Sequence, residues 1–143
     1  MDEPFFHLGI LVKDIEQARA DFAALIGVEF EPAQSRRVGT GEKLRVCYSL
    51  PGPPYLELME MAGTGSYSPE QPEGLHHIGV SDASVPDRCA AFGGRVGLVN
   101  AAPDGSPQVV LTEPGALHGV RLEYFDASVA APFLGYLRSR TLG

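Results

Sequence analysis

The stretch His7-Leu8-Gly9-Ile10 near the amino terminus returns as His77-Ile78-Gly79-Val80, and the two histidines are 77 − 7 = 70 residues apart. A second pair follows in the same order, because Leu56-Glu57-Leu58 returns as Leu122-Glu123-Tyr124, 123 − 57 = 66 residues later. One half of the chain therefore repeats the other with a short deletion. Each half contributes one imidazole and one carboxylate at corresponding places in strand-like runs.

Side-chain alternation predicts that these polar residues share one face of a sheet, because successive side chains of a strand point to opposite faces. The apolar residues form one row, and four polar residues fall opposite: His7, Glu57, His77 and Glu123. Gly9 and Gly79 lie two residues beyond each histidine, where a missing side chain leaves room for a ligand. A single strand histidine is more often structural, but an ionised carboxylate in an apolar strand is costly unless paired or metal-bound. The joint pattern therefore favours a divalent-metal site.

Length and composition fit a single domain, 1–143, with 44% hydrophobic residues. The net charge of −7 and the pI near 5.0 argue against nucleic acid or an anionic membrane as the main partner. The amino-terminal residues lack a secretory pattern, and no run approaches the roughly 20 apolar residues of a membrane span, so we expect a cytoplasmic protein. Cys47 and Cys89 lack the spacing of a zinc knuckle or a disulfide scaffold, and we expect reduced thiols.

Hydrophobic periodicity and turn residues predict the order βαβββ in both halves. The first module is 5–61, a Gly- and Pro-rich linker covers 62–74, and the second module is 75–126. The predicted strands are 5–12, 28–34, 43–50, 55–61, 75–81, 96–101, 108–112 and 120–125. The predicted helices are 14–25, with Asp14 as N-cap and Gly27 as its stop, then 84–92 and a terminal helix, 129–141.

The repeated segments resemble the vicinal oxygen chelate superfamily, which includes glyoxalase I, methylmalonyl-CoA epimerase, extradiol dioxygenases, and the fosfomycin and bleomycin resistance proteins. The resemblance covers residues 5–126 and rests on four segments in order: 7–18, 56–60, 74–80 and 119–123. It implies an α+β fold in which two βαβββ modules form a cupped mixed sheet around a metal site. The four ligand positions of the family fall here on His7, Glu57, His77 and Glu123. These donors suit a divalent ion such as Zn, Ni, Co, Mn or Fe.

The ligand set favours the proton-transfer enzymes of this superfamily. By resemblance, extradiol dioxygenases and fosfomycin-modifying members use three residues, whereas Glu57 supplies a fourth, as in glyoxalase I and the epimerases. Leu11 stands where glyoxalase I often carries an arginine for glutathione, and Leu75-His76-His77-Ile78 is closer to the epimerases. A second catalytic glutamate of the epimerases aligns loosely with Val38-Gly39-Thr40, near Glu42, so the substrate assignment stays open.

We therefore expect a metal-dependent isomerase, epimerase or lyase that removes a proton beside the carbonyl of a small carbonyl or thioester substrate, by way of a metal-stabilised enolate. Glu123 is the first choice for the base and Glu57 the second. Two alternatives stay open: a small-molecule binding or resistance protein without turnover, and an iron-dependent dioxygenase. Metal content distinguishes the first alternative, and oxygen uptake the second.

Strand parity also predicts the remaining residues of the concave face and thus a partly apolar small-molecule substrate. They are Phe5, Tyr55, Met59, Met61 and Phe125, with Arg45 and Cys47 on a neighbouring strand. His118 lies near the open end of the last strand, as a surface residue or a proton donor, and His76 is expected to face the apolar row. Apolar rows without cover predict a homodimer.

Overall fold

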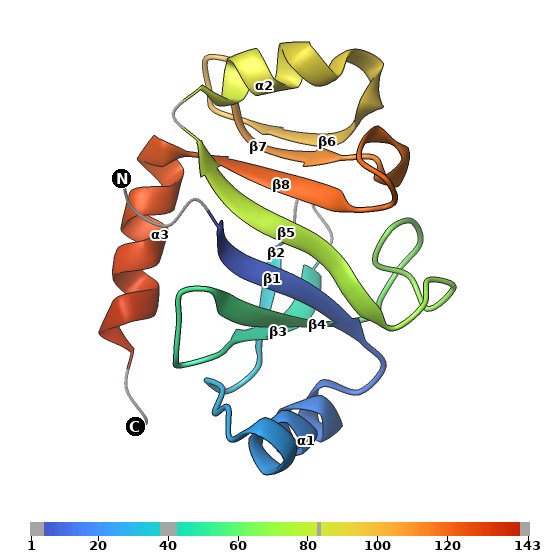
Figure 1. The fold of residues 1–143 in the computed structure, drawn as a ribbon, viewed down its shortest axis with the longest axis vertical. Coiled ribbons are helices and arrows are strands. Elements are labelled where there is room, and N and C mark those ends of the chain that lie inside the picture. The colour runs from blue at the N-terminus through green and yellow to red at the C-terminus, as the bar shows by residue number, and fades with distance from the viewer. Residues whose placement is uncertain (1–4, 38–42, 83, 141–143) are drawn as a thin grey trace.

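The computed structural model describes residues 5–37, 43–82 and 84–140, and its elements follow the predicted order (Figure 1). The strands are β1 (Phe5–Val12), β2 (Gln34–Arg37), β3 (Lys43–Tyr48), β4 (Tyr55–Glu60), β5 (Gly74–Asp82), β6 (Val96–Ala101), β7 (Pro107–Thr112) and β8 (Arg121–Asp126). The helices are α1 (Ile15–Ile26), α2 (Val85–Phe92) and α3 (Ala127–Ser139), with short 3-10 turns η1 (Gly93–Arg95) and η2 (Pro114–Ala116). The predicted α+β class with two βαβββ modules is confirmed.

The eight strands form one curled mixed sheet, in the order β2-β3-β4-β1-β5-β8-β7-β6. β1 pairs in parallel with β4, β5 pairs in parallel with β8, and β1 and β5 are antiparallel neighbours at the centre. The order is equivalent when read from the centre to either edge, so an approximate twofold axis passes between β1 and β5. The Leu8–Ile78 pair lies at this axis, with His7 opposite Gly79 and Gly9 opposite His77.

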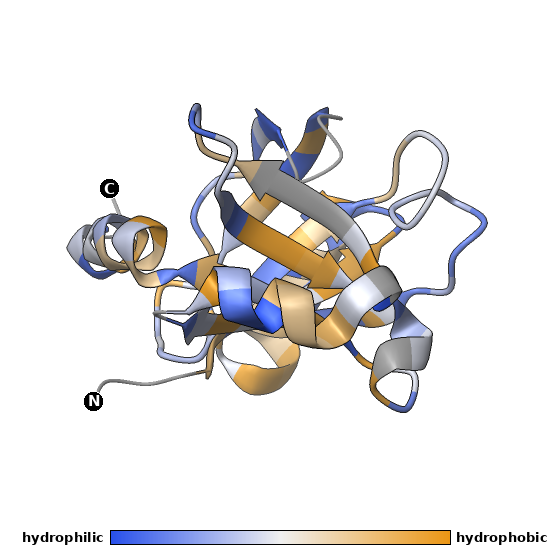
Figure 2. Ribbon diagram, turned by 90° about the horizontal axis from the view of Figure 1, so that it is seen from above, coloured by the Kyte–Doolittle hydropathy of each residue, from blue (hydrophilic) through white to orange (hydrophobic). Residues whose placement is uncertain are grey.

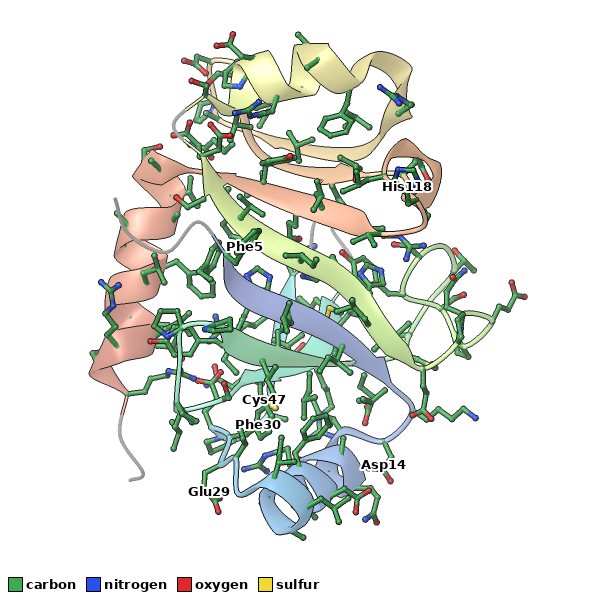
Figure 3. All side chains as sticks on the ribbon, viewed as in Figure 1. Phe5, Asp14, Glu29, Phe30, Cys47 and His118 are labelled. Atoms are coloured by element: carbon green, nitrogen blue, oxygen red, sulfur yellow. The ribbon has the colours of Figure 1, made fainter. Side chains whose placement is uncertain are left out.

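Each central strand contains an irregularity that simple alternation does not predict. The β1–β5 register shifts beside Phe6 and again beside His76, at equivalent places, since 76 − 6 = 70. A bulge can place consecutive side chains on one face, and Phe6 and His76 accordingly join their neighbouring histidines on the inner, concave face. Two predictions are therefore wrong. Phe5, at the start of β1 (Figure 3), is 59% exposed, and His76 contacts His77 and does not face the outer apolar row.

The first helix begins and ends where its sequence predicts. The Asp14 side chain accepts a hydrogen bond from the Gln17 amide at 3.0 Å, which caps α1, and Gly27 ends it with a φ of 70°. α1 packs on the outer face, where Ile15 contacts a cluster that includes Phe30, Cys47 and Leu58. At the other end of the sheet α2 packs on β7 and β8 (Figure 1).

The third helix lies along one side of the sheet and helps to enclose its inner face (Figure 1). It begins at Ala127, two residues before the predicted start, and Leu134 and Leu137 pack with Phe6, Tyr48 and Tyr55. Strands that cross the interior are largely hydrophobic, and hydrophilic residues gather mainly in the peripheral loops and helices (Figure 2). Among the described residues, no helix combines the length and the apolar character needed to cross a membrane.

The edge of the first module differs from the prediction. The strand expected at 28–34 is replaced by β2, at Gln34–Arg37, and of the earlier segment only Phe30 bridges to Ser49. Pro32 explains the delay, because it has no amide hydrogen to donate to a strand ladder.

The side-chain parity of β3 also differs from the prediction. Cys47 packs beneath α1 (Figure 3), and Arg45 forms an ion pair with Glu16 of α1 at 2.8 Å, so both lie on the outer face. Their predicted place on the concave face is wrong. Both faces of this strand are covered, because Val46 and Cys47 are each buried. Its apolar pattern therefore does not indicate which side chains face the concave side of the sheet.

Candidate metal centre

The four polar residues that the repeat singles out converge at the centre of the inner face. The Nε2 atoms of His7 and His77 are 2.9 Å apart. Glu123 Oε1 lies 3.1 Å from Nε2 of His7 and 3.3 Å from Nε2 of His77. Glu57 Oε1 lies 3.6 Å and 3.3 Å from the same two atoms. A single chain thus brings all four side chains together, and each residue is at most 9% exposed.

The strand register explains this convergence. Across the sheet, Glu57 of β4 and His77 of β5 flank Gly9 of β1, whereas His7 and Glu123 flank Gly79 of β5. The missing side chains matter, because a Cβ built on Gly9 would overlap the His77 imidazole, and one on Gly79 would overlap that of His7. Each module therefore supplies a histidine that lies over the glycine of the other module.

The geometry of the cluster fits a divalent cation. Two donors bound to one ion at about 2.1 Å are about 3.0 Å apart at right angles and about 3.4 Å apart at the tetrahedral angle. The nitrogen–oxygen and nitrogen–nitrogen separations here run from 2.9 to 3.6 Å. The donor atoms of His7, Glu57 and His77 lie within 4.8 Å of one another, so these three buried residues could hold an ion. Two buried carboxylates also provide the negative charge that a cation would neutralise.

Electrostatics link the histidines to the carboxylates. Burial alone raises the pKa of Glu123, but attraction to His77 and a hydrogen bond with His7 outweigh burial and hold that pKa below its usual value. Burial lowers the pKa of His77, yet Glu123 and Glu57 more than reverse this and raise it. These opposite shifts favour an imidazolium beside an ionised carboxylate, and a bound cation would replace that proton.

The two carboxylates differ in their surroundings. Tyr48 donates a hydrogen bond to Glu57 Oε2 at 2.8 Å, and burial together with the nearby Glu57 raises the pKa of Tyr48 well above its usual value, so the hydroxyl keeps its proton. Among the described residues, Glu123 accepts no hydrogen bond from a hydroxyl or an amide. Glu57 is therefore held at one oxygen by a hydroxyl, whereas no hydroxyl of the described residues holds Glu123.

A cavity of about 320 Å³ lies over the cluster. Its wall is mostly apolar, with two arginines from β2: Val46, Met59, Tyr67, Val109, Phe125, Val129, Phe133, Arg36 and Arg37. Met59 and Phe125 thus line it as predicted. Tyr55 instead lies beneath α3, and Met61 packs beside the cluster that contains Tyr67.

Sequence reasoning missed three residues that contact the site: Tyr48, Tyr67 and His76. His76 Nδ1 lies 2.8 Å from Nδ1 of His77, and its Nε2 lies 3.0 Å from the Ser66 carbonyl oxygen. Burial, followed by the influence of His77, lowers the pKa of His76 to about 3, so its ring is neutral. Tyr67 stacks on this ring with centroids 4.6 Å apart. The segment predicted as a linker therefore returns to the site, and the signal for it was a lone aromatic residue in a Gly- and Pro-rich stretch.

Two other candidates from the sequence do not join the cluster. His118 is exposed in the loop before β8 and does not line the cavity (Figure 3). The segment Val38-Gly39-Thr40 and the nearby Glu42, considered for a second catalytic glutamate, lie outside the described residues.

Comparison with known proteins supports the geometry. A family model described as the Glyoxalase/Bleomycin resistance protein/Dioxygenase superfamily matches residues 6–97. A variant of Streptomyces coelicolor methylmalonyl-CoA epimerase in complex with 2-nitronate-propionyl-CoA is 25% identical, with a TM-score of 0.60 over 85% of this chain and 94% of that chain. A methylmalonyl-CoA epimerase in complex with methylmalonyl-CoA and NH4+ is 25% identical, with a TM-score of 0.62 over 88% and 96%.

Two further comparisons give less information about function. The methylmalonyl-CoA epimerase from Mycobacterium tuberculosis is 16% identical, with a TM-score of 0.60 over 85% of this chain and 86% of that one, which shows a shared fold alone. No curated protein sequence matches the chain.

Proposed function

Because this chain belongs to the glyoxalase/bleomycin resistance protein/dioxygenase superfamily, we propose that it is a metal-dependent enzyme that moves a proton on the carbon beside a carbonyl group. The reaction is of the epimerase, isomerase or lyase type. The observation that carries this proposal is the pair of unequal carboxylates beside two imidazoles under a mostly apolar cavity. The two similar epimerases that hold acyl-CoA ligands favour a thioester as substrate.

Four residues would hold the cation: His7, Glu57, His77 and Glu123. A bound divalent cation acts as a Lewis acid that polarises a carbonyl oxygen and stabilises the charge that develops when the adjacent carbon loses a proton. The two imidazoles and the Tyr48-anchored Glu57 have fixed positions, because their donor atoms are buried and glycines leave room for both rings. The chain thus provides a rigid set of donors in a site with little access to water.

Glu123 is the base in this proposal. Its Oε1 lies beside both imidazoles at the buried centre, so the carboxylate can take the proton from a substrate held there. A carboxylate that binds a cation through one oxygen keeps the other for proton transfer. Glu57 comes from the opposite module across the approximate twofold axis, so the two carboxylates approach a bound molecule from different sides. Return of a proton from the side of Glu57 would invert the carbon, as an epimerase must.

The wall of the cavity sets the substrate class. Apolar side chains such as Met59 and Phe125 suit a short hydrocarbon group, and the volume of about 320 Å³ suits a small acyl unit. Arg36 and Arg37 add positive charge to the same wall, which favours a substrate that carries a negative group. We therefore propose a small, partly apolar carbonyl or thioester compound with an acidic group.

The experiment is exchange of the substrate α-proton with deuterated water, followed by NMR with methylmalonyl-CoA and a panel of small carboxylated carbonyl compounds. The metal-loaded wild-type protein should exchange the proton, and Glu123→Gln should lower the rate about 10²- to 10⁴-fold, the usual contribution of a catalytic base. An amide oxygen can still bind a cation, so metal content measured for both proteins separates lost binding from lost chemistry.

The assignment of Glu123 as the base is wrong if metal-loaded Glu123→Gln exchanges the proton at the wild-type rate. Absence of exchange by the wild-type protein across the whole panel would contradict the proposed reaction. A protein that binds the test compounds without exchange would instead be a binding or resistance protein.

An iron-dependent dioxygenase is the second candidate, because His7, Glu57 and His77 alone form a set of two histidines and one carboxylate. That set is typical of non-haem iron oxygenases. Oxygen uptake by the iron-loaded protein with phenolic substrates, without proton exchange, would favour this candidate over the first.

A further inference from the structure

Two hydrogen bonds connect the backbone carbonyl group of Ser66, by way of His76, to Nδ1 of His77. The carbonyl oxygen of Ser66 lies 3.0 Å from Nε2 of His76, and Nδ1 of His76 lies 2.8 Å from Nδ1 of His77. The opposite nitrogen of His77, Nε2, faces His7 and the two carboxylates. From these contacts we propose that His76 is a positioning residue, which fixes His77 in the tautomer that leaves Nε2 free for a cation.

The direction of each hydrogen bond follows from one atom that can only accept. The carbonyl oxygen of Ser66 has no hydrogen, so Nε2 of His76 must donate. A neutral imidazole carries one N–H, so Nδ1 of His76 is left as an acceptor. Nδ1 of His77 therefore donates to it, and in the neutral His77 ring Nε2 keeps a lone pair for a cation. Histidines that bind metals commonly donate their other N–H to a partner of this kind, which sets the tautomer and the ring orientation.

The first module provides an internal comparison. Phe6 occupies the equivalent bulge and contacts the His7 ring edge-to-face, with centroids 4.6 Å apart. Nδ1 of His7 is buried and has no hydrogen-bond partner among the described residues. Among the described residues, Nδ1 of His7 is therefore placed by packing alone, whereas Nδ1 of His77 also makes a hydrogen bond. The approximate twofold symmetry is broken at one pair of residues, Phe6 and His76.

His76 acts through His77 and does not contact the substrate in this proposal. It is 4% exposed, stacks on Tyr67, and is absent from the wall of the cavity. Both of its nitrogens are already engaged, one with Ser66 and one with His77. A direct catalytic role would need a nitrogen that reaches the cavity.

The bulge in the first module also suggests the best variant. His76→Phe gives the second module the residue that the first module already has at this position, so the ring packing is kept and the hydrogen bond is lost. Phe6→Leu is the matched control, because it weakens the packing on His7 and leaves the contacts between Ser66, His76 and His77 intact. His76→Asn is the rescue variant, since its amide oxygen can accept a hydrogen bond near the place of Nδ1.

The readout is the tautomer of the neutral His77 ring in the metal-free protein, measured by nitrogen NMR of labelled histidine at a pH high enough to deprotonate the imidazoles of the cluster. The wild-type protein should show His77 protonated at Nδ1. In His76→Phe the Nε2-protonated form should become populated, because a neutral imidazole in water prefers that form. Affinity for Zn²⁺ alone should fall about 10- to 100-fold, the typical effect of removing such a partner. His76→Asn should recover part of both changes, and Phe6→Leu should leave the His77 tautomer unchanged.

A wild-type spectrum in which the neutral His77 ring is protonated at Nε2 and not at Nδ1 would overturn the proposal without any variant, so it stays testable if His76→Phe fails to fold. An unchanged tautomer together with wild-type Zn²⁺ affinity in His76→Phe would also overturn it. The inference rests on the proposed metal site, but the tautomer is measured without metal or substrate. A protein that shows the tautomer change and lacks proton exchange would contradict the proposed reaction alone.

Discussion

The two glycines that accommodate the imidazoles give the sharpest test of the site, and Gly79→Ala is the most informative change. A Cβ at this position would overlap Cε1 and Nδ1 of the His7 ring, whereas the ring itself is fully buried. The ring has nowhere to move without disturbing its neighbours, since Phe6, Tyr48, His77 and Phe125 pack around it. The added methyl group should therefore displace the His7 imidazole from the cluster.

The sign of the stability change makes this prediction specific. Glycine within a strand or a helix usually destabilises it by roughly 0.5–1 kcal/mol relative to alanine, so Gly→Ala would ordinarily stabilise the protein. At Gly79 this gain is opposed by overpacking, which typically costs about 1–3 kcal/mol. The free energy of unfolding should thus fall, by up to about 2.5 kcal/mol, instead of rising. Affinity for Zn²⁺ should fall by at least about 10-fold, because one donor leaves its position.

Gly135 of α3 is the matched control, because a Cβ there would meet no atom within 4 Å. Urea denaturation of the metal-free proteins should show Gly135→Ala stabilised by roughly 0.5–1 kcal/mol and Gly79→Ala destabilised. Zn²⁺ titration against a competing chelator gives the affinities, and Gly135→Ala should bind like the wild type. The reasoning is refuted if Gly79→Ala is stabilised like the control and keeps the wild-type affinity.

Three further predictions concern other parts of the molecule. Tyr48→Phe removes the hydroxyl that donates to Glu57 at 2.8 Å, so the free energy of unfolding should fall by about 1.5–3 kcal/mol in urea denaturation; an unchanged value would mean that this hydrogen bond does not contribute. Burial raises the pKa of Cys47 to about 12, so at pH 8 its thiol stays protonated. Iodoacetamide should therefore label the half-buried Cys89 in the native protein and both cysteines in urea; mass spectrometry that finds equal labelling without urea would contradict this. Sedimentation should give a homodimer, because apolar side chains on the outer face of the central strands are only half covered; a monomer at micromolar concentration would argue against it. These side chains are Leu8, Ile10, Ile78 and Val80.

The sequence by itself determined the features that depend on residue type and on short periods. The repeated His-x-Gly segments and the two strand glutamates identified the four residues that meet in the structure, because only a few side chains bind metals and strand side chains alternate with a period of two. Asp14 and Gly27 set the limits of α1 for an equally local reason, since the cap and the stop lie in the same short stretch. The twofold arrangement of the modules also follows from the repeat.

Only the tertiary structure decided how the site is completed. The bulges that turn Phe6 and His76 inward are defined by the register between β1 and β5, whose paired residues lie far apart in the sequence. The place of Tyr48 beside Glu57 could not be predicted either, because both faces of β3 are covered and its apolar pattern does not show which side chains face inward. Tyr67 reaches His76 through the path of an irregular segment. Each of these contacts depends on which strand or loop packs against which, and hydrophobic periodicity within one segment contains no information about its partner.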